Sequence, residues 1–259
     1  MSFELPDPKP EKLVRSPLTL VVCQVSHEHI DVGDPNLARA IHNEIKESYP
    51  ILEQQVTPQF AVAIGQPDSA LTPGALYQGW KLHPSDSSWN VVINPRFYSL
   101  ETNHYQDWPN FRQRLEQLTQ AVANAVHPSL EQRIGLRFIN RIKHPEVQSV
   151  ADWRHLIDPS FLGPIAHHKL GDSVRSSQQV LQLNVEDKMF VTIRHGVFQE
   201  PALPGEDAYV IDQDCFTHPS ETFSPKHVMD SAEKLHTLVL QIFQQTITTN
   251  LYDYLLKGR

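Results

Sequence analysis

An alternating segment in the middle of the chain constrains the fold more than any other stretch. Residues 133–142 read Arg-Ile-Gly-Leu-Arg-Phe-Ile-Asn-Arg-Ile. Successive side chains of a strand point to opposite faces. One face would therefore carry Arg133, Gly135, Arg137, Ile139 and Arg141. The other would carry Ile134, Leu136, Phe138, Asn140 and Ile142. The pattern predicts a strand with a buried apolar back and, on its front, three guanidinium groups spaced roughly 13 Å apart.

The functional meaning of this arginine row depends on what lies over it. Guanidinium groups match phosphates and carboxylates bidentately, so Arg133, Arg137 and Arg141 could hold a phosphate, a nucleotide or the carboxylates of a partner. The alternative is internal pairing, because an apolar run at residues 208–215 places Asp212 and Asp214 on one face. If that run lies beside the arginine strand, cross-strand Arg–Asp pairs form within the molecule. Both interpretations can hold together, since two carboxylates need not neutralise three guanidinium groups.

Composition places the chain among folded, acidic proteins. Its 259 residues suffice for one large domain or two of ordinary size. With 40% apolar and 8% aromatic residues, it can bury a core and is unlike a disordered protein. The formal net charge of -8 argues against a general binder of duplex DNA, which depends on an excess of Lys and Arg. An acidic body would instead complement a basic partner.

The cysteines and the apolar runs indicate the compartment. We expect Cys23 and Cys215 to be buried free thiols, because two cysteines in apolar strand-like runs do not make a disulfide framework. The N-terminal residues do not form a secretory signal. No window reaches the about 18 consecutive apolar residues that cross a bilayer. These features predict a cytoplasmic protein that does not insert into a membrane.

The first half of the chain carries clear start and stop signals. Pro6, Pro8 and Pro10 predict an extended, proline-rich arm over residues 1–16. Asp34 followed by Pro35 marks the start of one helix, and a second helix is expected from about residue 107 to 126. Strands are expected at residues 18–25, 60–64, 76–82, 89–93 and 97–101, with good turn residues at 84–88.

The second half repeats this order. The arginine strand, residues 132–143, is followed by a short helix that opens with a capping-box pattern at residues 149–152. Strands are expected at 180–185, 189–193 and 208–215, and one long helix capped by Ser224 is expected to continue to Leu251. Each half then reads strand, helix, about three strands, long helix.

This order predicts an α+β fold of two similar modules, residues 17–128 and 129–259, which could also form one continuous domain. A helix with one apolar stripe must bury it against a sheet, so we expect a mostly antiparallel sheet with the long helices packed on one face. The spacing from Val92 to Tyr105 equals that from Val210 to Phe223. Internal duplication and chance similarity both remain open.

Three stretches together resemble a known family. They are Arg15–Leu18 with Val21–Val25, Phe97–Thr102 with Tyr105, and the arginine strand. In this combination the chain is similar to a sporadically distributed, functionally undescribed family of bacterial and archaeal proteins of about this length, which share an R-I-G-L-R-[FY]-I-N-R-I strand. The resemblance implies a prokaryotic, cytosolic protein, and the patchy distribution suggests an accessory or defence-type system. It transfers no catalytic residue.

Signatures of catalysis are sparse. The chain contains no G-x-S-x-G elbow, no G-x-x-x-x-G-K-[ST] phosphate loop and no G-x-G-x-x-G turn. His27 and His29 stand at alternate positions and could contribute to a metal site, but a zinc site needs three or four ligands, and surface loop histidines are the competing interpretation. His195, between Arg194 and Gly196 at a strand end, is a candidate site residue, with burial in the core as the alternative.

These observations favour a non-enzymatic binding or regulatory protein. We expect it to recognise a protein partner, or a second copy of itself, through an open sheet face and the proline-rich arm, without a cofactor, a metal or catalytic residues. An alternative is a sensor in which the arginine row and His195 hold a nucleotide or another small anion. A third possibility is a metal-dependent hydrolase built on His27 and His29. The candidate ligand- or partner-binding residues are Arg133, Arg137, Arg141, His195, Asp212 and Asp214.

Overall fold

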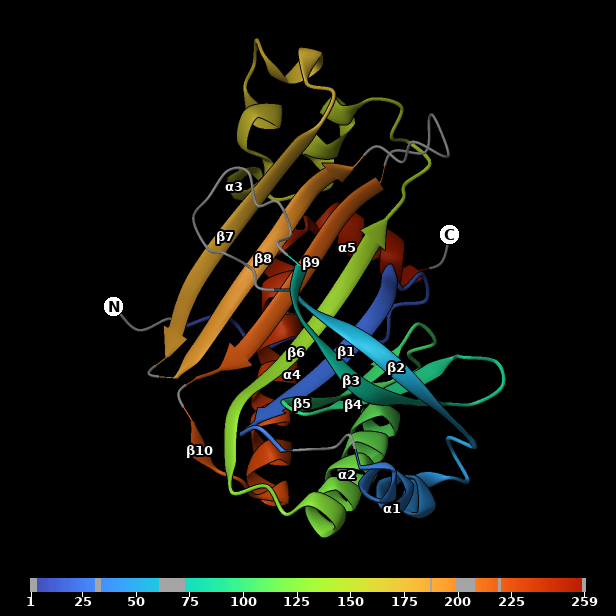
Figure 1. The fold of residues 1–259 in the computed structure, drawn as a ribbon. Helices are drawn as coiled ribbons and strands as arrows, with labels where there is room; N and C mark the ends of the chain where they lie inside the picture. The colour runs from blue at the N-terminus through green and yellow to red at the C-terminus, as the bar shows by residue number, and fades with distance from the viewer. Residues whose placement is uncertain are drawn as a thin grey trace. The chain divides into compact units, whose positions relative to one another are not determined.

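The computed structural model describes residues 4–30, 34–60, 73–186, 188–198, 208–218 and 220–257, with the side-chain surroundings of 56–60 and 73–77 left aside. The elements of the first half are β1 (Leu18–His27), α1 (Pro35–Ile45), β2 (Ile51–Phe60), β3 (Pro73–His83), β4 (Trp89–Asn94), β5 (Phe97–Thr102) and α2 (Trp108–Val126). They are followed by β6 (Leu130–Ile142), η1 (Val150–His155), α3 (Pro159–Leu162), η2 (Gly163–Ala166) and η3 (Gly171–Ser173). The chain continues with β7 (Ser177–Glu186), β8 (Met189–Phe198), β9 (Ala208–Thr217), β10 (Glu221–Thr222), α4 (Pro225–Thr246) and α5 (Thr249–Lys257) (Figure 1).

The predicted α+β class is confirmed. Within the described ranges, ten strands are joined by hydrogen bonds in the order β2-β3-β4-β5-β1-β6-β9-β8-β7, and β10 pairs with β6. The pairs from β2 to β5 are antiparallel. So are the pairs from β6 to β7 and the pair of β6 with β10. The hairpin β3–β4 forms where the turn residues at 84–88 predict it.

The strand order is symmetric about the neighbouring strands β1 and β6. Outward from β1 the strands follow in the reverse of chain order, as β5, β4, β3 and β2. Outward from β6 they do the same, as β9, β8 and β7. A duplicated module would give this arrangement. The duplication itself stays a prediction.

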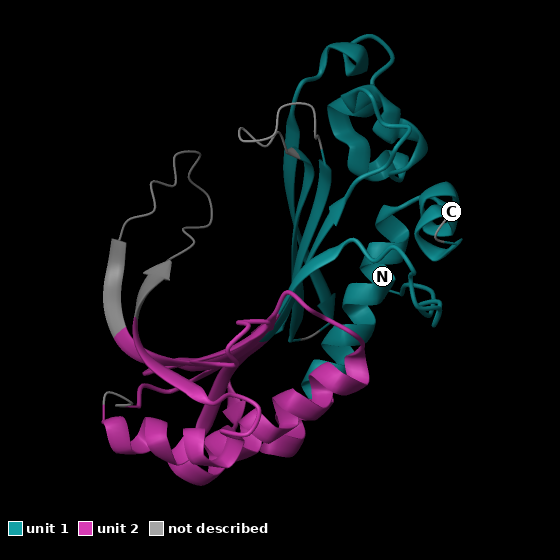
Figure 2. Ribbon diagram, turned by 90° about the vertical axis from the view of Figure 1, so that its right-hand side faces the viewer, with its two compact units in different colours: residues 1–21, 135–218, 231–259 teal, residues 22–134, 219–230 magenta. Residues whose placement is uncertain are grey.

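The chain forms two compact units that are interleaved along the sequence (Figure 2). Unit 1 contains residues 1–21, 135–218 and 231–259, and unit 2 contains residues 22–134 and 219–230. The strands β1 and β6 and the helix α4 therefore each contribute residues to both units. The boundaries of an arm and two consecutive modules stay a prediction.

In unit 2 the helices begin where their capping residues predict. The Asp34 carboxylate accepts from Asn36 N at 2.9 Å at the start of α1. The Asp107 carboxylate accepts from Asn110 N at 2.9 Å at the start of α2. α2 buries an i, i+3/i+4 stripe, and α1 buries a shorter one. The buried residues of these stripes are Phe111, Leu115, Leu118 and Val122 in α2 and Ala38, Ile41 and Ile45 in α1.

In unit 1 the core lies between the sheet and α4. The Gln213 side chain of β9 donates to Val239 O of α4 at 3.4 Å. The rings of Phe138 in β6 and His236 in α4 lie 6.1 Å apart. A cap segment, residues 150–173, covers the same face of the sheet and opens with the predicted capping box at Ser149. We call this covered side of the unit 1 sheet its inner face.

The C-terminal helix differs from the prediction. The prediction of one continuous helix through Leu251 is wrong, because the chain forms α4 and α5 with a break at residues 247–248. Asp158 N donates to Thr246 O, and Thr248 N donates to Leu156 O, both at 2.9 Å. The Thr248 hydroxyl then accepts from Leu251 N in the first turn of α5. Tertiary pairing with the segment that follows η1 overrides the helical periodicity here.

The strand predicted at residues 60–64 is largely untested. β2 ends at Phe60, and residues 61–64 lie outside the described residues. β2 was not predicted, because the polar residues Glu53, Gln54 and Gln55 and the proline Pro58 hide its alternation.

Two further predictions concern the cysteines and the membrane. Cys23 and Cys215 are buried free thiols, as predicted. Burial raises the pKa of Cys23 to about 12. Among the described helices, none has both the length and the apolar character to cross a membrane.

Candidate binding surface

The arginine strand has the alternation that its sequence predicts. Ile134, Leu136, Phe138 and Ile142 are buried, whereas Arg133, Arg137, Ile139 and Arg141 are half-buried. The side chains of Arg137 and Arg141 therefore lie on the side of the unit 1 sheet opposite the inner face, and Arg133 belongs to unit 2. The cross-strand register extends this side over four strands. We call it the open face, and its residues are Arg137, Ile139 and Arg141 of β6, Val210, Asp212, Asp214 and Phe216 of β9, Phe190, Thr192 and Arg194 of β8, and Gln178, Val180, Gln182 and Asn184 of β7.

Arg137 is held by an internal carboxylate. Its Nε donates to Asp212 Oδ1 and its Nη2 donates to Asp212 Oδ2, each at 2.7 Å. The pair is diagonal, because Asp214 lies directly opposite Arg137 in the register and Asp212 lies opposite Ile139. The hydrogen bonds to Asp212 raise the pKa of Arg137, against the opposing effect of burial. The internal pairing is confirmed for this arginine.

Arg194 of β8 adds a second cation to the same carboxylate. It lies opposite Asp212 in the register, and its Nη1 is 3.9 Å from Asp212 Oδ2. The Asp212 side chain is only 10% exposed, while those of Arg137 and Arg194 are 42% and 35% exposed. A buried carboxylate thus sits between two partly exposed guanidinium groups. An anionic ligand could take the Arg137 fork only by displacing Asp212.

The other two arginines of the row stand apart from this pair. Arg133 is four residues before Arg137, and Arg141 is four residues after it. Strand geometry therefore places the Cα atom of each roughly 13 Å from that of Arg137. Arg141 N donates to Pro17 O at 2.8 Å. Strand geometry therefore spreads Arg133, Arg137 and Arg141 along β6 instead of gathering them into one small pocket.

His195 does not lie on the open face. It is fully buried on the inner face, one residue out of phase with Arg194. Its Nδ1 lies 2.9 Å from the Tyr209 hydroxyl, and the Phe161 ring meets it edge-on. Burial lowers its pKa. A ligand or partner on the open face does not reach His195, because adjacent residues of a strand face opposite sides.

The histidine pair after β1 is divided between core and surface. His27 is buried, against the surface-loop interpretation, and His29 is exposed. The His27 ring stacks on Tyr98 at 6.4 Å, and its Nδ1 lies 2.7 Å from Glu28 O. The Glu28 carboxylate accepts from Ser129 N and Leu130 N. In the described part of the chain, no three His, Cys, Asp or Glu side chains are grouped as metal ligands.

The outer edge of β7 is a surface that was not predicted from the sequence. β7 ends the strand order, and no other described strand pairs with its outer side. It contains no proline, and from Ser177 to Val185 no charged residue. Val180 on its open face is 63% exposed. Every second residue of an edge strand directs its N–H and C=O groups away from the sheet. β7 therefore presents a long, uncharged strand edge.

One signal in the sequence could have pointed to this surface. The run from Gln178 to Val185 alternates weakly between polar and apolar residues and lacks the charges of a protected edge. The placement of Arg194 next to Asp212 follows from pairing β8 with β9, which sequence alone did not provide. Phe190 and Phe216, whose rings stack at 5.6 Å on the open face, were not selected either, because apolar residues in strands usually face the core.

Comparison with known proteins adds no assignment, because neither a protein-family model nor a curated protein sequence matches this chain.

Proposed function

We propose that this protein is a non-enzymatic binding or regulatory protein that recognises a protein partner by adding one of the partner's strands to β7. In this mode the edge strand provides backbone hydrogen bonds, and the side chains around it provide the preference for particular partners. The observation that carries the proposal is the unprotected edge of β7.

The opposite end of the strand order supports the choice of β7. β2 is the other terminal strand, and it has the features by which soluble proteins protect their edges. It contains Pro58, which lacks an N–H group, and its register with β3 shifts between Pro58 and Phe60. It also carries Glu53, whose carboxylate lies 3.4 Å from His83. β7 lacks a proline and carries no charge from Ser177 to Val185, which is expected of an edge that a partner covers.

The open face next to β7 defines the chemistry of the partner strand. Val180 and Gln182 would flank it, and both side chains are exposed. An added strand would place alternate side chains beside these two, so we expect aliphatic and uncharged polar residues at those positions. The net charge of -8 favours a partner that is basic outside the added strand.

The anion sensor is less well supported than partner binding. The Arg137 fork is filled by Asp212, and His195 lies on the other face of the sheet. The cytoplasmic location and the role in a prokaryotic accessory or defence-type system are part of the proposal. They rest on the family resemblance of the sequence.

The test uses a displayed library of short random peptides as the probe. Peptides selected on the 259-residue chain should bind the Val180→Lys and Gln182→Lys variants about tenfold or more weakly, because a lysine on an edge strand opposes further pairing. Both side chains are exposed, so the fold should persist. Gln117→Lys in α2 is the matched control, since Gln117 is also exposed and lies in the other unit.

Two results would contradict the proposal. One is that no selected peptide responds to the lysines in β7 more than to Gln117→Lys. The other is that the selected peptides bind at Arg137, which competition by free phosphate and a loss of binding in Arg137→Ala would reveal. That second result would favour the anion sensor.

A further inference from the structure

The proline-rich arm is docked within unit 1. Residues 4–13 form no helix or strand and follow α4 and α5. The Gln244 amide pairs with both polar backbone groups of Lys9: Lys9 N donates to its Oε1 at 2.9 Å, and its Nε2 donates to Lys9 O at 3.1 Å. Gln241 Nε2 donates to Leu5 O at 3.3 Å and to Pro6 O at 3.2 Å. Two glutamines one helical turn apart thus bind the arm through its backbone.

Aromatic side chains of α5 bind the charged residues of the arm. The Lys9 ammonium lies 4.2 Å from the centre of the Tyr252 ring, and the Tyr252 hydroxyl donates to the Glu11 carboxylate at 3.2 Å. The Arg15 guanidinium lies 4.3 Å from the centre of the Tyr254 ring. Such cation–π contacts add to affinity at partly exposed sites. We call this surface the arm track, formed by Gln241, Gln244, Tyr252 and Tyr254.

The sequence of the arm suits this mode of binding. Prolines at positions 6, 8 and 10 favour an extended polyproline conformation, whose backbone carbonyls make no internal hydrogen bonds. Those carbonyls are free to accept from the glutamines. A chain that is extended before it binds loses less entropy on docking.

The arm is held weakly compared with the core. No residue from Glu4 to Ser16 is buried, and Val14 near its end is 71% exposed. Segments with few buried contacts open at low cost in free energy. The arm track can therefore become accessible without unfolding of unit 1.

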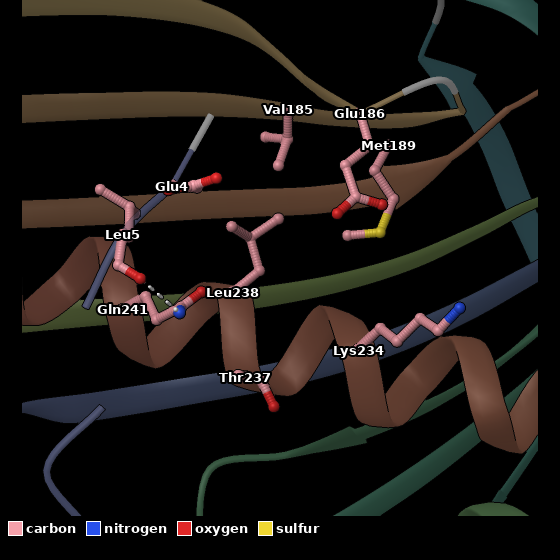
Figure 3. A pocket seen from close by; sticks show the side chains of 9 residues that line it. All are labelled: Glu4, Leu5, Val185, Glu186, Met189, Lys234, Thr237, Leu238 and Gln241. Carbon is pink, nitrogen blue, oxygen red and sulfur yellow. Dashed lines mark hydrogen bonds between the residues drawn. The ribbon is translucent and has the colours of Figure 1, made fainter. Parts of the chain in front are cut away.

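The arm track continues past the first described residues of the arm. A cavity of about 450 Å³ lies along α4 beyond Leu5 (Figure 3). Its apolar lining comes from Leu5, Val185, Met189 and Leu238, and Lys234 and Glu186 add charges. The surface thus accommodates a longer extended segment than residues 5–15.

From these contacts we propose that the arm track is a binding site for an extended, proline-bearing segment of a partner protein. The segment carries a basic residue at the Tyr252 ring, and the protein's own arm occupies the site in its absence. The glutamines bind backbone groups, so another chain of the same conformation makes the same contacts. The protein's own arm competes with the partner segment at an effective concentration of about millimolar. The partner segment therefore binds only when it displaces the arm. The hydrogen bonds and cation–π contacts of this site do not involve β7.

The experiment weakens the binding of the protein's own arm in the 259-residue chain and leaves the arm track intact. Lys9→Pro removes the N–H group that Gln244 accepts from and the ammonium that Tyr252 binds. A labelled synthetic peptide of residues 4–15 is the probe, and anisotropy measures its binding. The peptide should bind Lys9→Pro about tenfold or more tightly than wild type, because the competing arm is weakened. Added in the Lys9→Pro background, Gln244→Ala should abolish binding.

Gln245→Ala provides the matched control. Gln245 is the same residue type in the next position of α4, and it is exposed. Two results would overturn the proposal. One is that, in the Lys9→Pro background, the Gln244→Ala and Gln245→Ala proteins bind the peptide equally well. The other is that the peptide does not bind the Lys9→Pro protein. A concentration-dependent dimer of Lys9→Pro or wild type in sedimentation, dissociated by the peptide, would instead assign the site to the arm of a second copy. Val180→Lys should leave peptide binding unchanged, which separates this test from that of β7.

Discussion

The pair of Arg137 and Asp212 offers the sharpest quantitative test of the open face. Both bonds of the fork are 2.7 Å, and the side chains are 42% and 10% exposed. Exposed ion pairs contribute about 0–1 kcal/mol, and charged hydrogen bonds in shielded places about 1.5–3 kcal/mol. This half-shielded fork should therefore couple the two residues by about 1–2 kcal/mol.

The two single substitutions should differ in their cost. Arg137→Ala leaves Asp212 beside Arg194 at 3.9 Å, so one cation still faces the carboxylate. Asp212→Ala removes the shared carboxylate and leaves Arg137 and Arg194 facing each other. Asp212→Ala should therefore lower the free energy of unfolding by more than Arg137→Ala does. Arg137→Lys should recover part of the loss, because it keeps the charge and loses the fork.

The assay is a double-mutant cycle in urea, followed by fluorescence and by amide hydrogen exchange in β8 and β9. The exposed pair of Arg112 and Glu116 in α2, at 3.3 Å, is the matched control and should couple by about 0.5 kcal/mol or less. A coupling for Arg137 and Asp212 no larger than that of the control would refute the reasoning. So would a greater loss of stability in Arg137→Ala than in Asp212→Ala.

Three other predictions follow from single positions. Burial lowers the pKa of His236 to about 4. The unfolded chain binds this proton more tightly, so acidification below the unfolded value of about 6.5 destabilises the fold. Between pH 7 and pH 4.5, the free energy of unfolding should therefore fall by about 2 kcal/mol less in His236→Gln than in wild type, as urea titrations would show. An equal fall in both proteins would contradict this prediction. Gly196 has φ 141, and a Cβ there would meet Ser177 O. Gly196→Ala should cost about 2 kcal/mol or more and speed amide exchange in β7, and unchanged exchange would contradict this. Asp107→Ala removes the cap of α2 and should lower stability by about 1 kcal/mol, whereas Asp107→Asn should lose less, as thermal melts would show.

The parts of the fold that follow local rules could be predicted from the sequence. Asp34, Asp107 and Ser149 act as caps because their side chains and neighbours suffice to start a helix. The arginine strand has the predicted faces, because alternation needs only the strand conformation.

Features that depend on tertiary pairing could not be predicted. α4 ends at Thr246 because residues 246 and 248 bond with residues 158 and 156, which lie far away in sequence. Asp212 meets Arg137 diagonally because the register of β6 with β9 is fixed by the packing of whole strands. His195 faces the core because it lies on the same face of β8 as the buried residues Val191 and Ile193. Its position next to Arg194 in the sequence suggested a shared site, but adjacent strand residues face opposite sides.

The role of the arm required structure as well. Its prolines predict an extended chain, but they do not say what binds it. Gln241, Gln244 and Tyr252 lie more than 200 residues after the arm, and nothing in their local pattern distinguishes them from other residues of α4 and α5.

Amide hydrogen exchange along β7 tests the central claim most directly. With a selected peptide bound to the 259-residue chain, the outward amides of residues 177–186 should exchange more slowly, while those of residues 51–55 in β2 should keep their rates. Protection confined to other elements, with β7 unchanged, would contradict strand addition at this edge.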